Sequence, residues 1–152
     1  VHLGIGLLQL GLKPSGSNFA SFGLLDMAYY TKKDEFTDDI IPFEKKAWEK
    51  AMILPQLPDT CMTVQFSHIM AGGYAAGYYS YKWAEVLDAD AFAVFKKHGI
   101  FDQQTAQRFC DNILSRGGTE NPMVLYKRFK GSEPTIDALL KRNGIKRQKA
   151  KA

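Results

Sequence analysis

Apolar residues follow the period of an α-helix along most of the chain. The clearest case lies between residues 43 and 52, where apolar positions recur at i, i+4, i+5, i+8 and i+9: Phe43, Ala47, Trp48, Ala51 and Met52. The opposite face carries charge: Glu44, Lys45, Lys46, Glu49 and Lys50. Pro42 fits the first turn, and Pro55 ends the pattern. These residues predict an amphipathic helix whose charged face is solvated.

Glycines, prolines and capping residues mark further elements. We predict a charged loop over residues 31–39, an extended segment over 61–66 and five more helices, of which the first two run from Phe22 to about Tyr30 and over about 74–97. The third is capped by Asp102 and closed by Gly117 and Gly118, and its apolar face carries Ala106, Phe109, Cys110, Ile113 and Leu114. The fourth runs from Pro122 to Gly131, and the fifth is opened by Ser132 and Pro134 and buries Ile136, Leu139 and Leu140 before Gly144. No segment shows sustained strand alternation, so the predicted fold class is mainly α.

One face of the predicted helix over 74–97 carries phenols and a carboxylate. At 100° per residue, its members fall within about 60° of one another: Tyr74, Tyr78, Tyr81 and Glu85. The opposite side is the predicted core face: Tyr79, Trp83, Val86 and Leu87. Just upstream, His68 and a loop with two glycines would bring an imidazole and bare backbone close to the phenols. This pattern is compatible with a polar cleft.

Packing alone also accounts for such a row of tyrosines. Each ring buries area and each hydroxyl finds some partner, so tyrosine-rich helices are more often packed than catalytic. A single histidine before a glycine loop is usually a local hydrogen-bonding residue. The spacing by itself therefore favours the structural interpretation and leaves the functional one open.

The formal net charge of +4 comes from the end of the chain. Residues 141–152 hold six of the 20 Lys and Arg and no acidic residue, so the preceding residues carry 14 basic against 16 acidic side chains, a net of −2. A nucleic-acid-binding face needs basic residues spread over a folded surface. The distribution of charge therefore excludes nucleic acid as the expected partner.

Common metal and nucleophile motifs are absent from the sequence. The three histidines, His2, His68 and His98, include no pair at i, i+4, so there is no His-Glu-x-x-His zinc motif. Cys61 and Cys110 form no Cys-x-x-Cys site and fit a reduced, intracellular setting. The longest apolar stretch, residues 1–12, is interrupted and falls well short of the ~20 residues of a membrane span. We therefore expect no metal bound by this chain and no membrane association.

Three runs of residues resemble a known family. HIMAGGYAAGYYSYKW, residues 68–83, is similar to the C-terminal region of the thimet-oligopeptidase family of zinc metallopeptidases, which includes oligopeptidases and peptidyl-dipeptidases. The run ILSRGGTENPMVLYKRFKGSEPTIDALLKRNGI, residues 113–145, resembles the terminal helices of that family, and FGLLDMAYY, residues 22–30, also fits. The resemblance covers roughly residues 22–145.

The resemblance implies a part of a larger enzyme. Family members are mostly helical and much longer than this chain, with two lobes around a deep channel, and they hold zinc on a His-Glu-x-x-His helix and a further Glu upstream of the segment seen here. The chain is then expected to be the helical C-terminal segment of a cytoplasmic, zinc-dependent peptidase that hydrolyses short peptides. It would act either as a peptidyl-dipeptidase, the slightly favoured choice, or as an endo-acting oligopeptidase.

The same resemblance assigns roles to individual residues. His68 and Tyr74 match side chains that hydrogen-bond the oxygen of the tetrahedral intermediate or the bound peptide, and Tyr81 matches a further phenol facing the zinc. Phenols that stay protonated at neutral pH can donate to a developing negative charge. The implied substrate-binding residues are Gly72, Gly73 and Tyr78. The zinc ligands have no counterpart in this sequence.

The expected organisation has three parts. Residues 1–21 fit no pattern and are either poorly assignable or not native; residues 22–145 form the C-terminal helical part of a catalytic domain; residues 146–152 are a basic tail. The expected partners are the upstream part of the same enzyme and short peptides. Without that upstream part and its zinc ligands, the chain alone is expected to be inactive and to bind no Zn²⁺. It is also expected to self-associate through the apolar surface that the upstream part would cover. The alternative is a non-catalytic helical module that binds peptide or protein.

Overall fold

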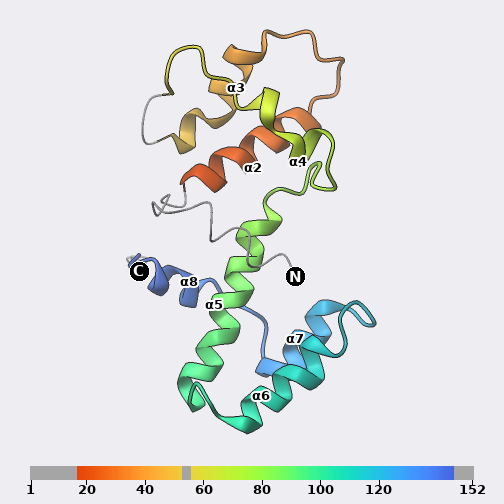
Figure 1. Cartoon of the computed structure of the whole chain (residues 1–152), viewed down its shortest axis with the longest axis vertical. Coiled ribbons are helices and arrows are strands. Elements are labelled where there is room, and N and C mark those ends of the chain that lie inside the picture. Colours follow the sequence, from red (N-terminus) through yellow and green to blue (C-terminus); the bar gives the residue numbers. More distant parts are fainter. Residues whose placement is uncertain (1–16, 53–55, 146–152) are drawn as a thin grey trace, which may run out of the picture. The chain divides into compact units, whose positions relative to one another are not determined.

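The part of the chain that the structure describes is built from helices, turns and loops. A computed structural model describes residues 17–52 and 56–145, and side chains from residue 20 onward. It divides into two compact units, Val1–Tyr81 and Lys82–Ala152, called the N-terminal and C-terminal units below. The described residues contain no strand, which confirms the mainly α fold class (Figure 1). Among them, no helix combines the length and the apolar character that crossing a membrane requires.

Among the described residues, the N-terminal unit contains three α-helices and two 3-10 turns (Figure 1): α2 (Ser17–Tyr30), α3 (Ile40–Trp48), α4 (Ser67–Met70), η1 (Glu49–Ala51) and η2 (Thr63–Gln65). The loop over 31–39 is confirmed. The prediction of an extended segment over 61–66 is wrong, since its middle is the turn η2. Pro55, the predicted end of the second helix, lies outside the described residues.

Side chains from all of these helices meet in one core: Leu25, Trp48, Phe66, Ile69 and Tyr78. The partly buried Phe22 ring packs against this core, with ring centroids 5.4 Å from Phe66, 5.9 Å from Tyr78 and 6.2 Å from Trp48. The predicted apolar face of α3 is confirmed at Trp48. The predicted charged face is wrong at one position, because Glu44 is fully buried.

The described part of the C-terminal unit contains one long helix, α5 (Ser80–His98, whose first two residues precede the division), and four shorter elements: α6 (Gln103–Phe109), the π-helical turn η3 (Cys110–Leu114), α7 (Pro122–Lys130) and α8 (Asp137–Arg142). The caps predicted at Asp102 and Gly131 are confirmed, but the predicted opening of the last helix at Ser132 and Pro134 is wrong, since α8 begins at Asp137. The Asp102 carboxylate accepts the Thr105 N–H at 2.7 Å, and Gly131 ends α7 with φ +91°. Tyr126 and Phe129 pack with Ala91 in the core of this unit.

Three predictions about these helices are wrong. The long helix begins at Ser80, and residues 74–79 form turns, because Ala76 takes a left-handed φ of +53° that an α-helix does not accommodate. Its predicted core face fails at Tyr79 and Trp83, which are 61% and 46% exposed, and holds at Val86. Two residues expected to be buried in the terminal helices are exposed: Leu114 and Ile136.

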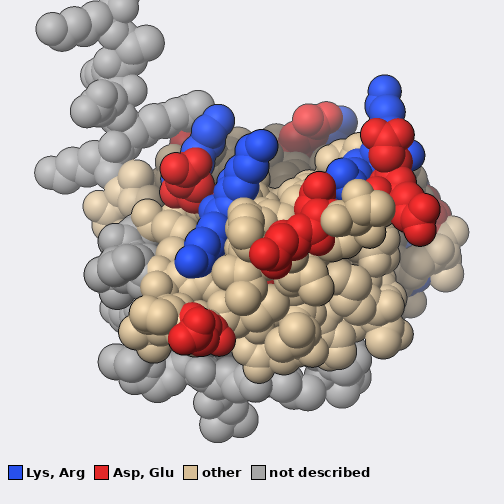
Figure 2. Space-filling view, turned by 90° about the horizontal axis from the view of Figure 1, so that it is seen from above, with Lys and Arg blue, Asp and Glu red and all other residues tan. Residues whose placement is uncertain are grey.

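Charges of both signs are mixed on the surface. Figure 2 shows Lys and Arg next to Asp and Glu on the face seen from above, beside a broad uncharged area. On this face, neither sign forms a continuous field. Surface ion pairs of the described residues include Lys32 with Asp38 at 3.1 Å and Lys127 with Glu133 at 2.6 Å.

Candidate active site

Four predicted site residues gather at one edge of the N-terminal core. The His68 imidazole lies 5.7 Å from the Tyr74 ring, 5.9 Å from Tyr78 and 6.5 Å from Tyr81, measured between centroids. Tyr74 and Tyr81 stack at 5.2 Å, and Tyr78 lies 5.1 Å from Tyr81. The structure therefore brings an imidazole and three phenols into one aromatic cluster, called the His–Tyr cluster below.

The turn between α4 and α5 brings these rings together, in place of the continuous helix predicted from Tyr74 onward. The chain folds back over α4, with the Gly72 N–H donating to the Ser67 carbonyl at 2.8 Å and the Tyr74 N–H donating to the His68 carbonyl at 3.2 Å. Tyr74 therefore returns to the side of His68. The predicted fourth member of the row, Glu85, belongs to the C-terminal unit and pairs with Lys82 at 2.9 Å.

The fold-back explains one of the two predicted glycines. A Cβ on Gly72 would lie 2.9 Å from the His68 carbonyl oxygen, closer than real Cβ contacts, so only glycine lets the chain pass here. A Cβ on Gly73 would meet no atom within 4 Å. Gly72 is therefore required by the turn itself, whereas Gly73 leaves its backbone open to the surroundings.

Exposure differs among the members of the His–Tyr cluster. His68 and both glycines are exposed, and Tyr74 and Tyr81 are half-buried. Tyr78 is 7% exposed and packs in the core, 5.0 Å from Phe66. The buried Tyr78 ring thus packs between the core and the more exposed rings of His68 and Tyr81.

Burial keeps two phenols of this cluster, those of Tyr78 and Tyr81, protonated. Burial, followed by a hydrogen bond with Tyr74, raises the pKa of Tyr81 to about 12. Burial also raises the pKa of Tyr78. A phenol that holds its proton well above neutral pH acts as a hydrogen-bond donor throughout the physiological range. The cluster can therefore donate to a negatively charged or carbonyl oxygen.

Asp26 on α2 holds the backbone that carries these tyrosines. It is fully buried, and its Oδ1 and Oδ2 accept the N–H groups of Ala76 and Tyr78, each at 2.9 Å. The sequence analysis missed this residue. The available signal was that Asp26 is the one acidic residue in the otherwise uncharged α2.

Glu44 on α3 does the same for the chain that leads into α4. Its carboxylate accepts the backbone N–H groups of Met62 at 2.9 Å and Thr63 at 2.7 Å, and Gln56 donates at 3.0 Å. Burial acts to raise the pKa of Glu44, but the hydrogen bonds outweigh it and hold the pKa below its ordinary value. Both buried carboxylates therefore use backbone N–H groups to fix irregular segments.

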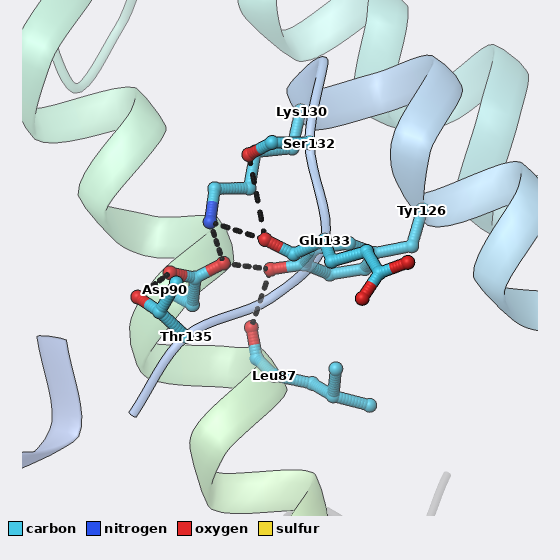
Figure 3. A network of polar contacts seen from close by, with 7 residues as sticks. All are labelled: Leu87, Asp90, Tyr126, Lys130, Ser132, Glu133 and Thr135. Carbon is cyan, nitrogen blue, oxygen red and sulfur yellow. Dashed lines mark hydrogen bonds and ion pairs between the residues drawn. The ribbon is translucent and has the colours of Figure 1, made fainter. Parts of the chain in front are cut away.

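A second buried polar cluster lies in the C-terminal unit (Figure 3). Asp90 accepts the Lys130 ammonium at 2.6 Å, the Tyr126 hydroxyl at 2.7 Å and the Thr135 hydroxyl at 3.2 Å. Burial would raise the pKa of Asp90, but the hydrogen bonds from Lys130 and Tyr126 lower it, and burial with the bond to Asp90 raises the pKa of Tyr126. This cluster joins α5 to α7 and the following loop, which is a structural role.

The described residues do not provide a metal centre. No group of three His, Cys, Asp or Glu side chains among them could hold a metal ion. His68 has aromatic neighbours in place of further ligands. The donor set of this part of the chain therefore does not fit zinc, and the His–Tyr cluster offers hydrogen-bonding groups.

Comparison with known proteins places the chain in a family. Residues 17–145 match Peptidase family M3. The chain is 67% identical to oligopeptidase A of Escherichia coli (strain K12) over 81 residues, which are 53% of this chain and 12% of that protein. It is 47% identical to oligopeptidase A of Haemophilus influenzae (strain ATCC 51907 / DSM 11121 / KW20 / Rd) over 125 residues, 82% of this chain and 18% of that protein.

A third relative carries a different name. Dipeptidyl carboxypeptidase of Escherichia coli (strain K12) is 36% identical over 131 residues, 85% of this chain and 19% of that protein. The chain thus spans less than a fifth of the length of each of these relatives. Because the family match covers most of the chain, the chain belongs to Peptidase family M3, the zinc metallopeptidase family that its sequence resembles.

Proposed function

We propose that the chain is the C-terminal part of a longer zinc-dependent oligopeptidase, called the full-length enzyme below, which hydrolyses peptide bonds of short peptides. Family membership supports the reaction class. The identity of 47% to an oligopeptidase A, against 36% to a dipeptidyl carboxypeptidase over a similar length, supports an oligopeptidase over a peptidyl-dipeptidase. Zinc, when bound upstream, would supply the activation of water; this chain would supply contacts to the peptide.

The observation that carries the proposal is the His–Tyr cluster beside an open glycine backbone. In peptide hydrolysis, negative charge develops on the carbonyl oxygen, and fixed neutral donors stabilise it. We assign that role to His68 and Tyr74, with Tyr81 as a second phenol. The Gly72 N–H is used within the turn, where it donates to the Ser67 carbonyl at 2.8 Å. Gly73, which is exposed and would have no atom within 4 Å of an added Cβ, is the glycine whose backbone suits contact with an extended peptide. Because Tyr78 is buried, we assign it the support of the other rings, in place of the direct substrate contact that the resemblance implies.

The test is to remove single hydroxyls from the full-length enzyme. Tyr74→Phe keeps the ring and its stacking, so kcat should fall by roughly 10²–10³ with KM changed far less if the hydroxyl meets the oxyanion. His68→Ala should lower kcat in the same direction, and the double variant should show less than the combined loss. The control is Tyr79→Phe, whose ring is 61% exposed and outside the cluster. Values of kcat for Tyr74→Phe, Tyr81→Phe and Tyr79→Phe all within about twofold of the unmodified enzyme would overturn these roles.

We also propose that the 152-residue chain alone neither binds stoichiometric zinc nor cleaves peptides. The sequence has no His-Glu-x-x-His motif. Exposed apolar side chains such as Val64 and Phe101, 78% and 90% exposed, support self-association of the isolated chain. Metal analysis and analytical ultracentrifugation of the chain test both statements. One tight zinc per chain, or a monodisperse monomer at high concentration, would contradict them.

A further inference from the structure

We propose that Asp26 is the positioning residue of the His–Tyr cluster: its buried carboxylate sets the path of the backbone that presents Tyr74, Tyr78 and Tyr81. This inference rests on the function proposed above and adds a residue on α2, some 50 positions away in the sequence. It concerns geometry, since Asp26 is fully buried and its carboxylate oxygens bond the backbone of the turn.

The turn over residues 71–79 needs an external partner to hold its shape. Ala76 has φ +53°, a left-handed conformation that costs a residue with a Cβ roughly 1–2 kcal/mol. A left-handed residue between two right-handed or extended ones turns its neighbouring N–H groups toward one point, where they bind an anion. The Asp26 carboxylate occupies that point, with Ala76 N–H on Oδ1 and Tyr78 N–H on Oδ2, both at 2.9 Å.

The position of Asp26 is itself fixed. The neighbouring Leu25 is fully buried in the core, and α2 packs on α3 through Phe22 and Trp48. Hydrogen bonds from N–H groups to an ionised carboxylate are about twice as strong as those between neutral groups. The helix α2 therefore fixes the Asp26 carboxylate, and this carboxylate fixes the turn on which the tyrosines lie.

The Asp26 carboxylate affects the positions of several rings because its two hydrogen bonds are made to backbone N–H groups between Tyr74 and Tyr81. Tyr78 is bonded directly through its N–H, and its ring contacts both His68 and Tyr81. Tyr74 lies two residues before the anchored Ala76 and stacks on Tyr81 at 5.2 Å. Release of the turn would let the stacked phenols move relative to the imidazole, although none of their own atoms had been changed.

The chain offers a matched control in Glu44. It is also fully buried, also accepts two backbone N–H groups, and lies in the same unit. Its partners, Met62 and Thr63, precede α4 and lie outside the turn. Glu44→Gln should therefore weaken the fold as Asp26→Asn does, but without releasing the turn.

The first experiment measures amide hydrogen exchange in the 152-residue chain. Asp26→Asn keeps the volume but turns an NH₂ donor or a weaker acceptor toward two N–H groups, so the amides of Ala76 and Tyr78 should exchange at least about tenfold faster. Glu44→Gln should speed exchange at Met62 and Thr63 and leave Ala76 and Tyr78 protected. Unchanged protection at Ala76 and Tyr78 in Asp26→Asn overturns the inference without any activity measurement.

The second experiment measures kinetics in the full-length enzyme. Asp26→Asn should lower kcat by roughly 10- to 100-fold with KM within about threefold, because misplaced donors act in the transition state. Glu44→Gln should keep kcat within about threefold of the unmodified enzyme. Equal kcat values for the two variants overturn the positioning role. If Asp26→Asn does not fold by circular dichroism, Asp26→Glu, which displaces the carboxylate by one methylene, is measured in the same way, with the same outcomes deciding.

The two proposals fail in different ways. If Tyr74→Phe and His68→Ala retain normal kcat, the proposed roles of the cluster are wrong, while the exchange measurement still decides whether Asp26 anchors the turn. If those variants lose activity and Asp26→Asn retains both protection and kcat, the cluster stands and Asp26 has no part in it.

Discussion

The buried carboxylates of the two units are neutralised in different ways. Asp26, in the N-terminal unit, accepts backbone N–H groups from a turn. Asp90, in the C-terminal unit, binds the ammonium of Lys130 and the hydroxyl of Tyr126 (Figure 3). The first arrangement shapes irregular backbone, whereas the second joins side chains of regular helices. A buried acid can therefore specify a loop or hold a helix in place, depending on its donors.

The cost of losing each carboxylate should differ accordingly. Removal of Asp26 leaves two N–H dipoles without their acceptor, and these can turn toward water when the loop relaxes. Removal of Asp90 leaves the Lys130 side chain, only 17% exposed, as a charge without a counter-ion. The N-terminal anchors therefore govern local order and the C-terminal pair governs stability.

The largest effect is expected for Asp90→Ala. Breaking this buried pair should lower the free energy of unfolding of the C-terminal unit by about 3–5 kcal/mol. The matched control is Asp88→Ala on the same helix, since Asp88 pairs with Arg142 at 2.6 Å on the surface, and its loss should be below about 1 kcal/mol. Urea unfolding followed by circular dichroism measures both. Equal losses would contradict the distinction between buried and surface pairs.

A smaller loss, about 2 kcal/mol at neutral pH, is expected for Glu44→Gln. Because the pKa of folded Glu44 lies below the ordinary value of 4.5, its contribution is complete above that value and disappears as the pH falls through the folded pKa. The unmodified chain should lose stability as the pH falls below about 5, and the variant should lose less over the same range. Urea midpoints between pH 7 and pH 3 test this. Parallel pH profiles would show that Glu44 is not the titrating group.

The two units also differ in how much of their structure could be predicted. In the C-terminal unit, helix ends coincide with Asp102, Pro122 and Gly131, because a cap acts on the residues next to it and is visible in a short window of sequence. In the N-terminal unit, residues 74–79 have helical periodicity but form turns. The contact that decides their conformation comes from Asp26, which no local pattern relates to them.

The candidate site was predicted from a helical stripe of tyrosines, but in the structure a turn brings these residues together. The predicted stripe required a helix, and the helix is absent at Tyr74; His68 and the tyrosines meet through the fold-back at Gly72. Their proposed roles came from the resemblance of a long run of residues, since spacing alone favoured packing. The burial of Glu44 could not be predicted, because this residue follows the polar face of a helix and only tertiary structure shows that its side chain is covered.

Gly72→Ala should cost about 1–3 kcal/mol, since the added Cβ would meet the His68 carbonyl oxygen at 2.9 Å and the backbone must shift. Gly73→Ala, with no atom within 4 Å, should be neutral to within about 0.5 kcal/mol. Urea unfolding of the chain measures both. An equal cost at the two positions would mean that the turn tolerates a side chain at either glycine, and that the fold-back does not depend on close approach.

The smallest effect, about 1 kcal/mol, is expected for Gly131→Ala at the end of α7. Here φ is +91° and no atom lies within 4 Å of an added Cβ, so the penalty comes from the residue's own backbone. Asn tolerates left-handed φ better than Ala, so Gly131→Asn should recover part of the loss. Gly72 lies outside the left-handed region, so Gly72→Asn should be no better than Gly72→Ala. Recovery by Asn at both positions would show that backbone conformation, and not contact with His68, selects glycine in the N-terminal unit as well.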